Sequence, residues 1–135
     1  SSKLKGITIP SKLSPMLIDE YPIISIAAAC AKGTTKMQGL NELRFKESDR
    51  IKSIHDNLNK CSLNCKVEKD NIVIKGSQNI IGTKKTIKTF NDHRIAMSFY
   101  ILGLVTEIPI KLDNENCINI SYPSFKKDLN KLLKI

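Results

Sequence analysis

Hydrophobic residues recur with helical spacing in four segments of the chain. The segments 21–31 and 92–105 are apolar on nearly every side, which predicts two buried helices. The segments 49–60 and 123–133 each have one apolar and one polar side, which predicts two amphipathic helices. Their apolar faces consist of Ile51, Ile54 and Leu58 in the first and Phe125, Leu129 and Leu132 in the second.

Short segments between these helices alternate between apolar and polar residues, or are rich in β-branched residues, and predict strands. A hairpin is expected across Asp70-Asn71, because turn-forming residues separate two such segments there. Gly33 is expected to end the first helix, as glycine commonly does. The predicted strands are 5–9, 34–40, 65–68, 72–75, 85–90 and 108–112.

The order of elements recurs along the chain, which indicates an internal duplication. Three pairs of identical residues are each 73 positions apart, namely Asp19 and Asp92, Ser25 and Ser98, and Ser48 and Ser121. Each copy runs strand, buried helix, strand, amphipathic helix. This predicts an α/β (α+β) fold of two stacked units, about 4–77 and about 84–135, that share one core.

The charge is strongly basic, with a formal net charge of +9. Lysine provides almost all of it, because the only arginines are Arg44, Arg50 and Arg94. Aromatic residues make up only 5% of the chain, whereas single-stranded nucleic acids usually bind to aromatic residues interleaved with basic ones. We therefore expect a solvated lysine-rich surface and no nucleic-acid partner. A non-catalytic basic domain that binds anions or nucleic acid is the alternative.

The composition also bears on the environment of the chain. No apolar run approaches the roughly 18 residues of a membrane span, so no membrane partner is expected. Cys61 and Cys65 lack well-placed histidines for zinc, so the four cysteines are expected to be free thiols of a cytoplasmic protein, with no metal site. The chain starts without methionine, so we expect either a processed product or a fragment of a longer protein.

Two segments combine acids, bases and arginine at predicted helix starts. In the first, 46–50 (KESDR), Ser48 is the expected helix cap. In the second, 91–94 (NDHR), Asp92 is the expected cap. Helix N-termini bind anions, and arginine grips carboxylates and phosphates with a rigid fork. In a duplicated fold the two segments should share one anion site, although capped helices with solvated charges would give the same pattern.

Candidate proton-transfer groups lie in the same segments. Glu47 could exchange a proton with a substrate, and the pKa of an ordinary histidine suits His93 for the same task. Asp19, before the first predicted helix, could act as a base towards a hydroxyl group. Paired acids at a helix start also stabilise the helix dipole, and from spacing alone this structural role is favoured for Asp19.

The segments LRFKESDR (43–50) and NDHRIAM (91–97) resemble two signatures of the 5-enolpyruvylshikimate-3-phosphate synthase family. The segments 18–35 and 121–125 (SYPSF) are also similar to that family, and all four occur in its order. The Ile-Asp-Glu sequence of residues 18–20, followed by Pro22, looks more like the bacterial subgroup that includes glyphosate-tolerant enzymes. The resemblance covers nearly the whole chain.

This resemblance implies an enolpyruvyl (carboxyvinyl) transferase of aromatic amino acid biosynthesis. Its substrates are shikimate 3-phosphate and phosphoenolpyruvate, phosphate is released, and no cofactor or metal is implied. The family's fold has two inside-out α/β barrel-like domains, each of three βαβαββ units with the site between the domains. The chain would then be an incomplete domain, without the N-terminal domain of the same enzyme.

The resemblance also assigns roles to residues of this chain. Asp19 would help to deprotonate the shikimate hydroxyl, and Glu47 would exchange a proton with the methylene carbon. Arg50 and Arg94 would grip the carboxylate and phosphate of phosphoenolpyruvate. The implied catalytic residues are Asp19, Lys46, Glu47 and His93, and the implied substrate-binding residues are Asp19, Lys46, Arg50 and Arg94.

One residue departs from the family's pattern, and two further interpretations of the chain are considered. Ile120 stands where some members have lysine, so one phosphoenolpyruvate contact would be absent or supplied differently. A UDP-N-acetylglucosamine enolpyruvyl transferase would share the fold, but KESDR and NDHR argue against it. A folded remnant that keeps the signatures only by descent is the third alternative.

Overall fold

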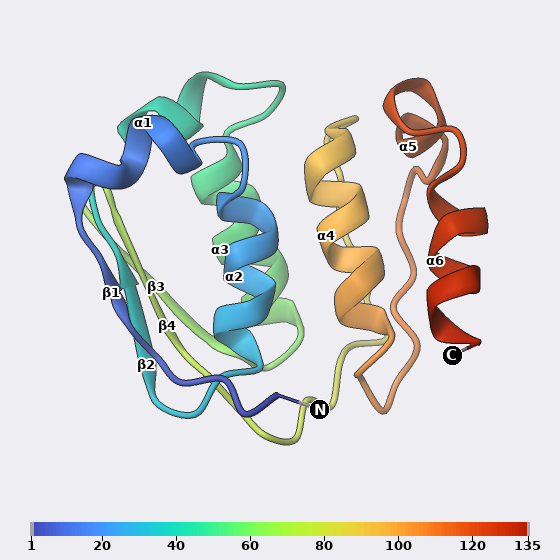
Figure 1. Cartoon of the computed structure of the whole chain (residues 1–135), viewed down its shortest axis with the longest axis horizontal. Coiled ribbons are helices and arrows are strands. Elements are labelled where there is room, and N and C mark those ends of the chain that lie inside the picture. The colour runs from blue at the N-terminus through green and yellow to red at the C-terminus, as the bar shows by residue number, and fades with distance from the viewer. Residues whose placement is uncertain (1, 135) are drawn as a thin grey trace.

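The computed structural model describes residues 2–134, which form a mixed α/β fold with helices on one face of a sheet (Figure 1). The sheet has the order β1-β2-β4-β3, in which β1 is parallel to β2 and the other neighbours are antiparallel. The α/β class expected from the sequence is confirmed. The strands are β1 (Thr8–Ile9), β2 (Thr34–Met37), β3 (Asn64–Glu68) and β4 (Asn71–Lys75).

The helices follow one another away from the sheet. Figure 1 shows α2 and α3 against one face of the sheet, α4 beside them, and α5 and α6 at the far end. None of the helices in residues 2–134 is long and apolar enough to cross a membrane. The α-helices are α1 (Ser14–Leu17), α2 (Tyr21–Ala29), α3 (Arg50–Lys60), α4 (His93–Gly103), α5 (Asn116–Ser121) and α6 (Phe125–Leu133), and the 3-10 helices are η1 (Ser11–Leu13) and η2 (Asn41–Phe45).

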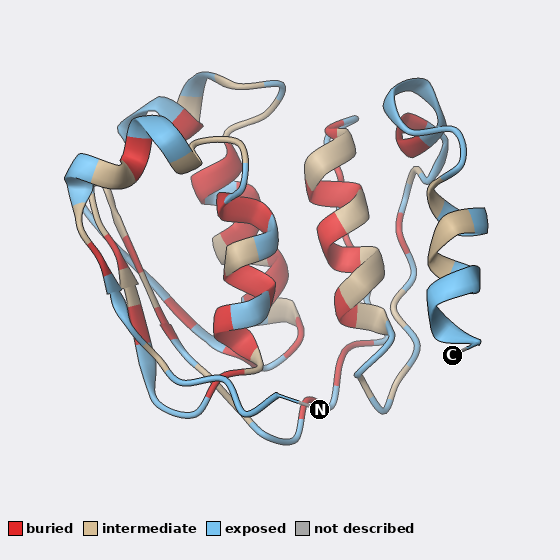
Figure 2. Ribbon diagram, viewed as in Figure 1, coloured by how far each residue is buried: buried red, intermediate tan, exposed pale blue. Residues whose placement is uncertain are grey.

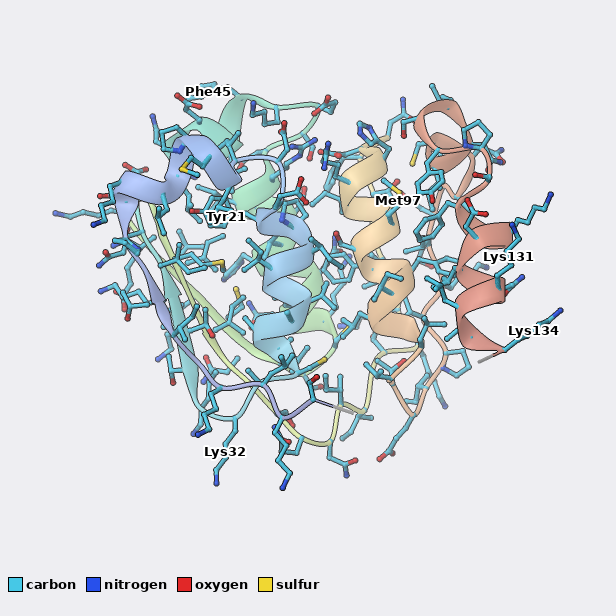
Figure 3. The ribbon with its side chains drawn as sticks, in the orientation of Figure 1. Tyr21, Lys32, Phe45, Met97, Lys131 and Lys134 are labelled. Atoms are coloured by element: carbon cyan, nitrogen blue, oxygen red, sulfur yellow. The ribbon has the colours of Figure 1, made fainter. Side chains whose placement is uncertain are left out.

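The core lies between the sheet and the first two long helices, and continues to α4 (Figure 2). In β4, Ile72 and Ile74 are fully buried while the residues between and beside them are more exposed, as expected for a strand with one face on the core. Tyr21 is fully buried, and Figure 3 shows its side chain on the sheet side of α2. The two predicted buried helices therefore exist and supply much of this core.

The predicted hairpin is present, but its turn lies one residue earlier than expected. Glu68 pairs with Asn71, so Lys69 and Asp70 form the turn. Lys69 has a φ of 57°, in the left-handed region that tight hairpin turns require. The prediction of Asp70-Asn71 was wrong because several residues in this stretch are acceptable in turns, and the sequence alone does not choose between neighbouring pairs.

Two predicted strands, 85–90 and 108–112, are wrong. These segments form only isolated parallel bridges, such as Ile87 with Leu112. Side chains bond to backbone N–H and carbonyl groups that would pair with a neighbouring strand in a longer β-ladder. Asn57 binds both the N–H and the carbonyl of Lys88, and the side chain of Asp113 accepts from the N–H of Thr89. The division into units 4–77 and 84–135 stays a prediction.

The C-terminal part differs from the sequence prediction in its helix boundaries. Ser121, expected to precede the last helix, ends the unpredicted α5, and α6 begins at Phe125. The face expected to pack is only partly covered, because Phe125 and Leu129 are half-buried while Leu132 is 67% exposed. The last helix therefore contributes less to the core than its amphipathic pattern predicts.

Candidate active site

Three helices begin at the same end of the molecule, and the sequence-predicted site segments lie at their starts (Figure 1). Asp19 and Glu20 directly precede α2, residues 46–49 precede α3, and Asp92 caps α4. A helix N-terminus carries partial positive charge and unpaired N–H groups. The fold thus brings together acids and bases that are far apart in the sequence.

The cap of α3 is Asp49, not Ser48 as the sequence predicted. The Asp49 side chain accepts a hydrogen bond of 3.1 Å from the N–H of Lys52. The Ser48 hydroxyl instead donates to Oδ2 of Asp92, at 2.8 Å. Both residue types are good caps, so the sequence could not distinguish them. Ser48 therefore connects the start of α3 to the start of α4.

Arg50 lies at the centre of the candidate site. Its Nη1 donates to Asp19 at 3.1 Å, its Nη2 to Glu47 at 2.5 Å, and its Nε to Asp92 at 2.9 Å. The side chain is only 1% exposed. The sequence predicted an accessible Arg50 guanidinium that would bind a substrate anion. In the structure this guanidinium is buried and already surrounded by carboxylates from three segments of the chain.

Asp92 is the buried counterpart of Arg50, and sequence reasoning gave it only a capping role. It accepts hydrogen bonds from the Arg50 side chain and from the N–H of Arg94, at 3.0 Å, which confirms that it caps α4. Burial alone would raise the pKa of Asp92, but hydrogen bonds from Arg50 and Ser48 and the charge of Arg50 bring this pKa below its ordinary value. Asp92 is therefore a buried carboxylate with a strong preference for the charged form.

Burial and the neighbouring carboxylates also have opposite effects on the pKa of the Arg50 guanidinium. Burial lowers its pKa, but the hydrogen bond and charge of Asp92, the charge of Glu47 and the hydrogen bond to Asp19 offset this, and the net pKa is raised. The pair therefore stays ionised at neutral pH. Removing one partner would leave an uncompensated buried charge, which typically costs several kcal/mol.

Arg94 and Lys46 complete the cluster around Asp19. Arg94 Nη1 donates to the backbone carbonyl of Asp19 at 3.1 Å and lies 3.5 Å from Glu20, while Lys46 Nζ lies 3.8 Å from the Asp19 carboxylate. The Arg94 side chain is 35% exposed, so this arginine is the accessible fork of the cluster. Four carboxylates face three cations in it: Asp19, Glu20, Glu47 and Asp92 against Lys46, Arg50 and Arg94.

His93 and Arg44 lie outside the network of contacts around Arg50 and Asp19. His93 is half-buried at the first position of α4, and no hydrogen bond of its ring is found within residues 2–134. Arg44, the third arginine of the chain, donates to the carbonyl of Lys69 at 2.8 Å and lies 3.7 Å from Asp70 and 4.0 Å from Asp49. Arg44 therefore stabilises the β3–β4 turn and does not take part in the cluster.

A hollow of about 430 Å³ opens beside the cluster between α2, α4 and α6. Asp19, Glu20 and Arg94 form its polar part, and the rest is largely apolar. Figure 3 labels Met97, which lines this hollow from α4. Ile120 is 82% exposed and does not line it. Apolar side chains in the lining include Ile23, Met97, Ile101, Tyr122 and Phe125.

The cysteines and other potential ligands form no second reactive centre in the described chain. All four cysteines are free, and burial raises the pKa of Cys61 to about 11 and that of Cys65 to about 12. Such thiols stay protonated and pack as small apolar groups. Within residues 2–134, no three His, Cys, Asp or Glu residues are grouped so that they could hold a metal ion.

Comparisons with known proteins agree on one family. A sequence profile described as EPSP synthase (3-phosphoshikimate 1-carboxyvinyltransferase) matches residues 3–129. The 3-phosphoshikimate 1-carboxyvinyltransferases of Petrotoga mobilis and Paramagnetospirillum magneticum are 44% and 43% identical over 100% and 98% of this chain. These matches cover 31% and 30% of the two relatives, so the chain spans about a third of their length.

The fold gives the same result. The 2.37 Å structure of EPSP synthase from Acinetobacter baumannii matches with a TM-score of 0.89 and 40% sequence identity. The match covers 96% of this chain and 30% of that one. A second EPSP synthase structure from the same organism matches with a TM-score of 0.86 and 37% identity. The fold and the sequence thus point to the same relatives.

Proposed function

The chain belongs to the EPSP synthase family, and on that basis we propose that it forms part of a site for enolpyruvyl transfer. In this reaction the enolpyruvyl group of phosphoenolpyruvate moves to the 5-hydroxyl of shikimate 3-phosphate, and inorganic phosphate leaves. The observation that supports the proposal most directly is the meeting of Asp19, Glu47 and Asp92 on one arginine. We also propose a cytoplasmic setting.

The reaction needs two kinds of proton transfer, which suit carboxylates placed close together. The hydroxyl oxygen attacks C2 of phosphoenolpyruvate and loses its proton, while C3 gains a proton, which gives a tetrahedral intermediate. Loss of phosphate and of a C3 proton then restores the double bond. We assign the hydroxyl proton to Asp19, assisted by Lys46, and the C3 proton to Glu47. Both carboxylates are partly exposed and can reach a substrate.

The substrate anions need cations in addition to those acids. We assign Arg94 to the carboxylate or phosphate of phosphoenolpyruvate, because it is the accessible arginine of the cluster. Arg50 can take part only if Glu47 or Asp19 moves away from it, since its nitrogens are occupied. His93, next to Asp92, is retained as a supporting residue of the site on the strength of the family resemblance alone.

The balance of charge leads to a first prediction. Three cations that already face four carboxylates are insufficient for two polyanionic substrates, and the remaining cations must come from the N-terminal domain that we propose as a partner. We therefore expect little or no turnover by the 135-residue chain. The measurement is the release of phosphate from phosphoenolpyruvate in the presence of shikimate 3-phosphate, and substantial release by the pure chain would contradict the prediction.

A chimera tests the proposed function itself. Residues 1–135 would replace the matching segment of the Petrotoga mobilis relative, which aligns over the whole chain. We expect the chimera to release phosphate from phosphoenolpyruvate when shikimate 3-phosphate is present. In the chimera, Glu47→Gln should lower kcat by roughly 100-fold or more, because general acid–base groups contribute about that much to rate.

The matched control is Glu42→Gln, which makes the same chemical change at an exposed carboxylate on η2. This control should leave kcat within about twofold, as expected for an exposed charge that has no hydrogen bond or ion pair with the cluster. A Glu47→Gln chimera as active as the Glu42→Gln chimera would remove Glu47 from the chemistry. A folded chimera without activity would show that this chain does not supply a competent part of the site.

A further inference from the structure

A basic groove of about 630 Å³ runs along α3, separate from the hollow beside Asp19 and Arg94. We call it the lysine groove. Its walls come from the exposed side of α3 and from residues 85–90, two segments that are adjacent only in the folded chain. The charged and aromatic residues that line it are Lys52, Lys60, Lys85, Lys88, His55, Asp56 and Phe90.

The one carboxylate in this lining is already paired. Asp56 accepts from Lys52 and contacts Nδ1 of the neighbouring His55 at 2.8 Å. Within residues 2–134, Lys60, Lys85 and Lys88 have no carboxylate within the 4.0 Å of a salt bridge. Three ammonium groups therefore face the same groove without a counter-charge.

The backbone beneath these lysines is firmly held. Asn57, which is 1% exposed, donates to the carbonyl of Lys88 at 2.8 Å and accepts from its N–H at 3.3 Å. Lys60 Nζ donates to the carbonyl of Thr86 at 3.3 Å, and Ile87 is fully buried. The two walls are thus joined, so the lysines start from a prearranged frame and lose less freedom when a ligand binds.

The other lysines differ from this arrangement. Figure 3 shows Lys32, Lys131 and Lys134 pointing away from the body of the molecule, as solvated surface charges do. In the lysine groove, by contrast, charge coincides with a concave shape of a size that commonly holds small molecules. Phe90 adds a half-exposed aromatic wall and is held at a φ of 52°, a backbone conformation that is unusual for phenylalanine.

We propose that the lysine groove binds a small phosphate compound with several negative charges, such as an oligophosphate. Lysine ammonium groups are effective point-charge ligands for phosphate, and a linear oligophosphate can contact several of them along a groove. A single-stranded nucleic acid fits less well, because Phe90 is the only Phe, Tyr or Trp in the lining. The groove shares no residue with the Asp19–Arg94 hollow, and of its residues only Lys52 and Phe90 also line a smaller hollow that contains Glu47. Lys60, Lys85 and Lys88, which carry the proposal, lie outside both hollows.

The test is calorimetric titration of the 135-residue chain with inorganic triphosphate at low salt. We expect saturable binding at one site. The triple variant Lys60→Gln, Lys85→Gln, Lys88→Gln should weaken it by at least about tenfold, equivalent to ~1.4 kcal/mol. The control triple Lys12→Gln, Lys66→Gln, Lys75→Gln removes the same charge from exposed positions outside the groove and should bind as the parent does. Circular dichroism confirms that both variants fold.

Equal weakening by the two triple variants would overturn the proposal, because it would reduce the effect to attraction by overall charge. Absence of saturable triphosphate binding to the parent chain would also overturn it. A third titration uses a 15-nucleotide oligothymidylate. Binding of this oligonucleotide that depends on Lys60, Lys85 and Lys88, without binding of triphosphate, would assign the groove to nucleic acid instead.

Discussion

Asp92→Asn is expected to destabilise the fold by about 3 kcal/mol, the lower end of the range for breaking a buried ion pair. The amide can still cap α4 by accepting from the N–H of Arg94, so the loss is mainly that of the negative charge. Arg50, 1% exposed, would keep Asp19 and Glu47 but lose its buried partner. The measurement is the free energy of unfolding in urea at pH 7.

The pH dependence provides a second readout of the same variant. The folded-state pKa of Asp92 is lowered, so its charge stabilises the fold above the unfolded pKa, about 3.9. This stabilisation is lost as the pH falls through the folded-state value. The gap in stability between the parent chain and Asp92→Asn should therefore be full at neutral pH and should narrow below about pH 4.

Asp49→Asn is the matched control, because it makes the same change at the cap of α3. Asp49 lies at a partly exposed position, where asparagine caps almost as well as aspartate, so the cost should stay below about 1 kcal/mol. If the two variants lost the same small amount, the Arg50–Asp92 pair would not contribute to stability as its burial indicates.

Gly76→Ala should destabilise the fold by about 3 kcal/mol, at the upper end of the usual cost of overpacking. A Cβ at this position would lie 1.8 Å from the carbonyl oxygen of Ala31 and 2.7 Å from that of Ala28. These are backbone atoms and cannot rotate away. The N–H of Gly76 also binds the carbonyl of Gly33 at 2.9 Å, so a shift of the strand end would break that contact.

Gly103→Ala makes the same change at the end of α4, where the nearest atom is the Cβ of Ile110 at 3.4 Å. This variant should be neutral or more stable by up to about 1 kcal/mol, because alanine favours helix over glycine. Thermal unfolding of both variants gives the comparison. A Gly76→Ala chain as stable as Gly103→Ala would show that β4 does not approach α2 as closely as described.

Much of the fold could be predicted because its signals are local. Helices α2, α3 and α4 follow from apolar spacing and start signals, and the hairpin follows from turn residues between β-branched segments. The segments 85–90 and 108–112 have strand-like sequences too, but a strand also needs a neighbour along its length. Buried Asn57 and exposed Asp113 satisfy backbone N–H groups there, and no sequence pattern reveals such long-range partners.

The candidate site was predictable in its members but not in its arrangement. The motif segments pointed to Asp19, Lys46, Glu47, Arg50 and Arg94. In the fold Lys46, Arg50 and Arg94 contact Asp19, and Glu47 contacts Arg50. That Arg50 is buried and already paired depends on how three helix starts converge, which spacing along the chain does not encode. Asp92 was predicted as a cap and was missed as the partner of Arg50 for the same reason.

The central position of Arg50 also affects how the chain unfolds. Its guanidinium contacts Asp19, which is 31 positions earlier in the sequence and precedes α2, and Asp92, which is 42 positions later and caps α4. If α3 or α4 detached alone, the buried ion pair between Arg50 and Asp92 would break. Local opening at these helix starts is therefore suppressed. The part of the chain with the sheet and α3 and the part with α4 should unfold in a single cooperative step rather than one after the other.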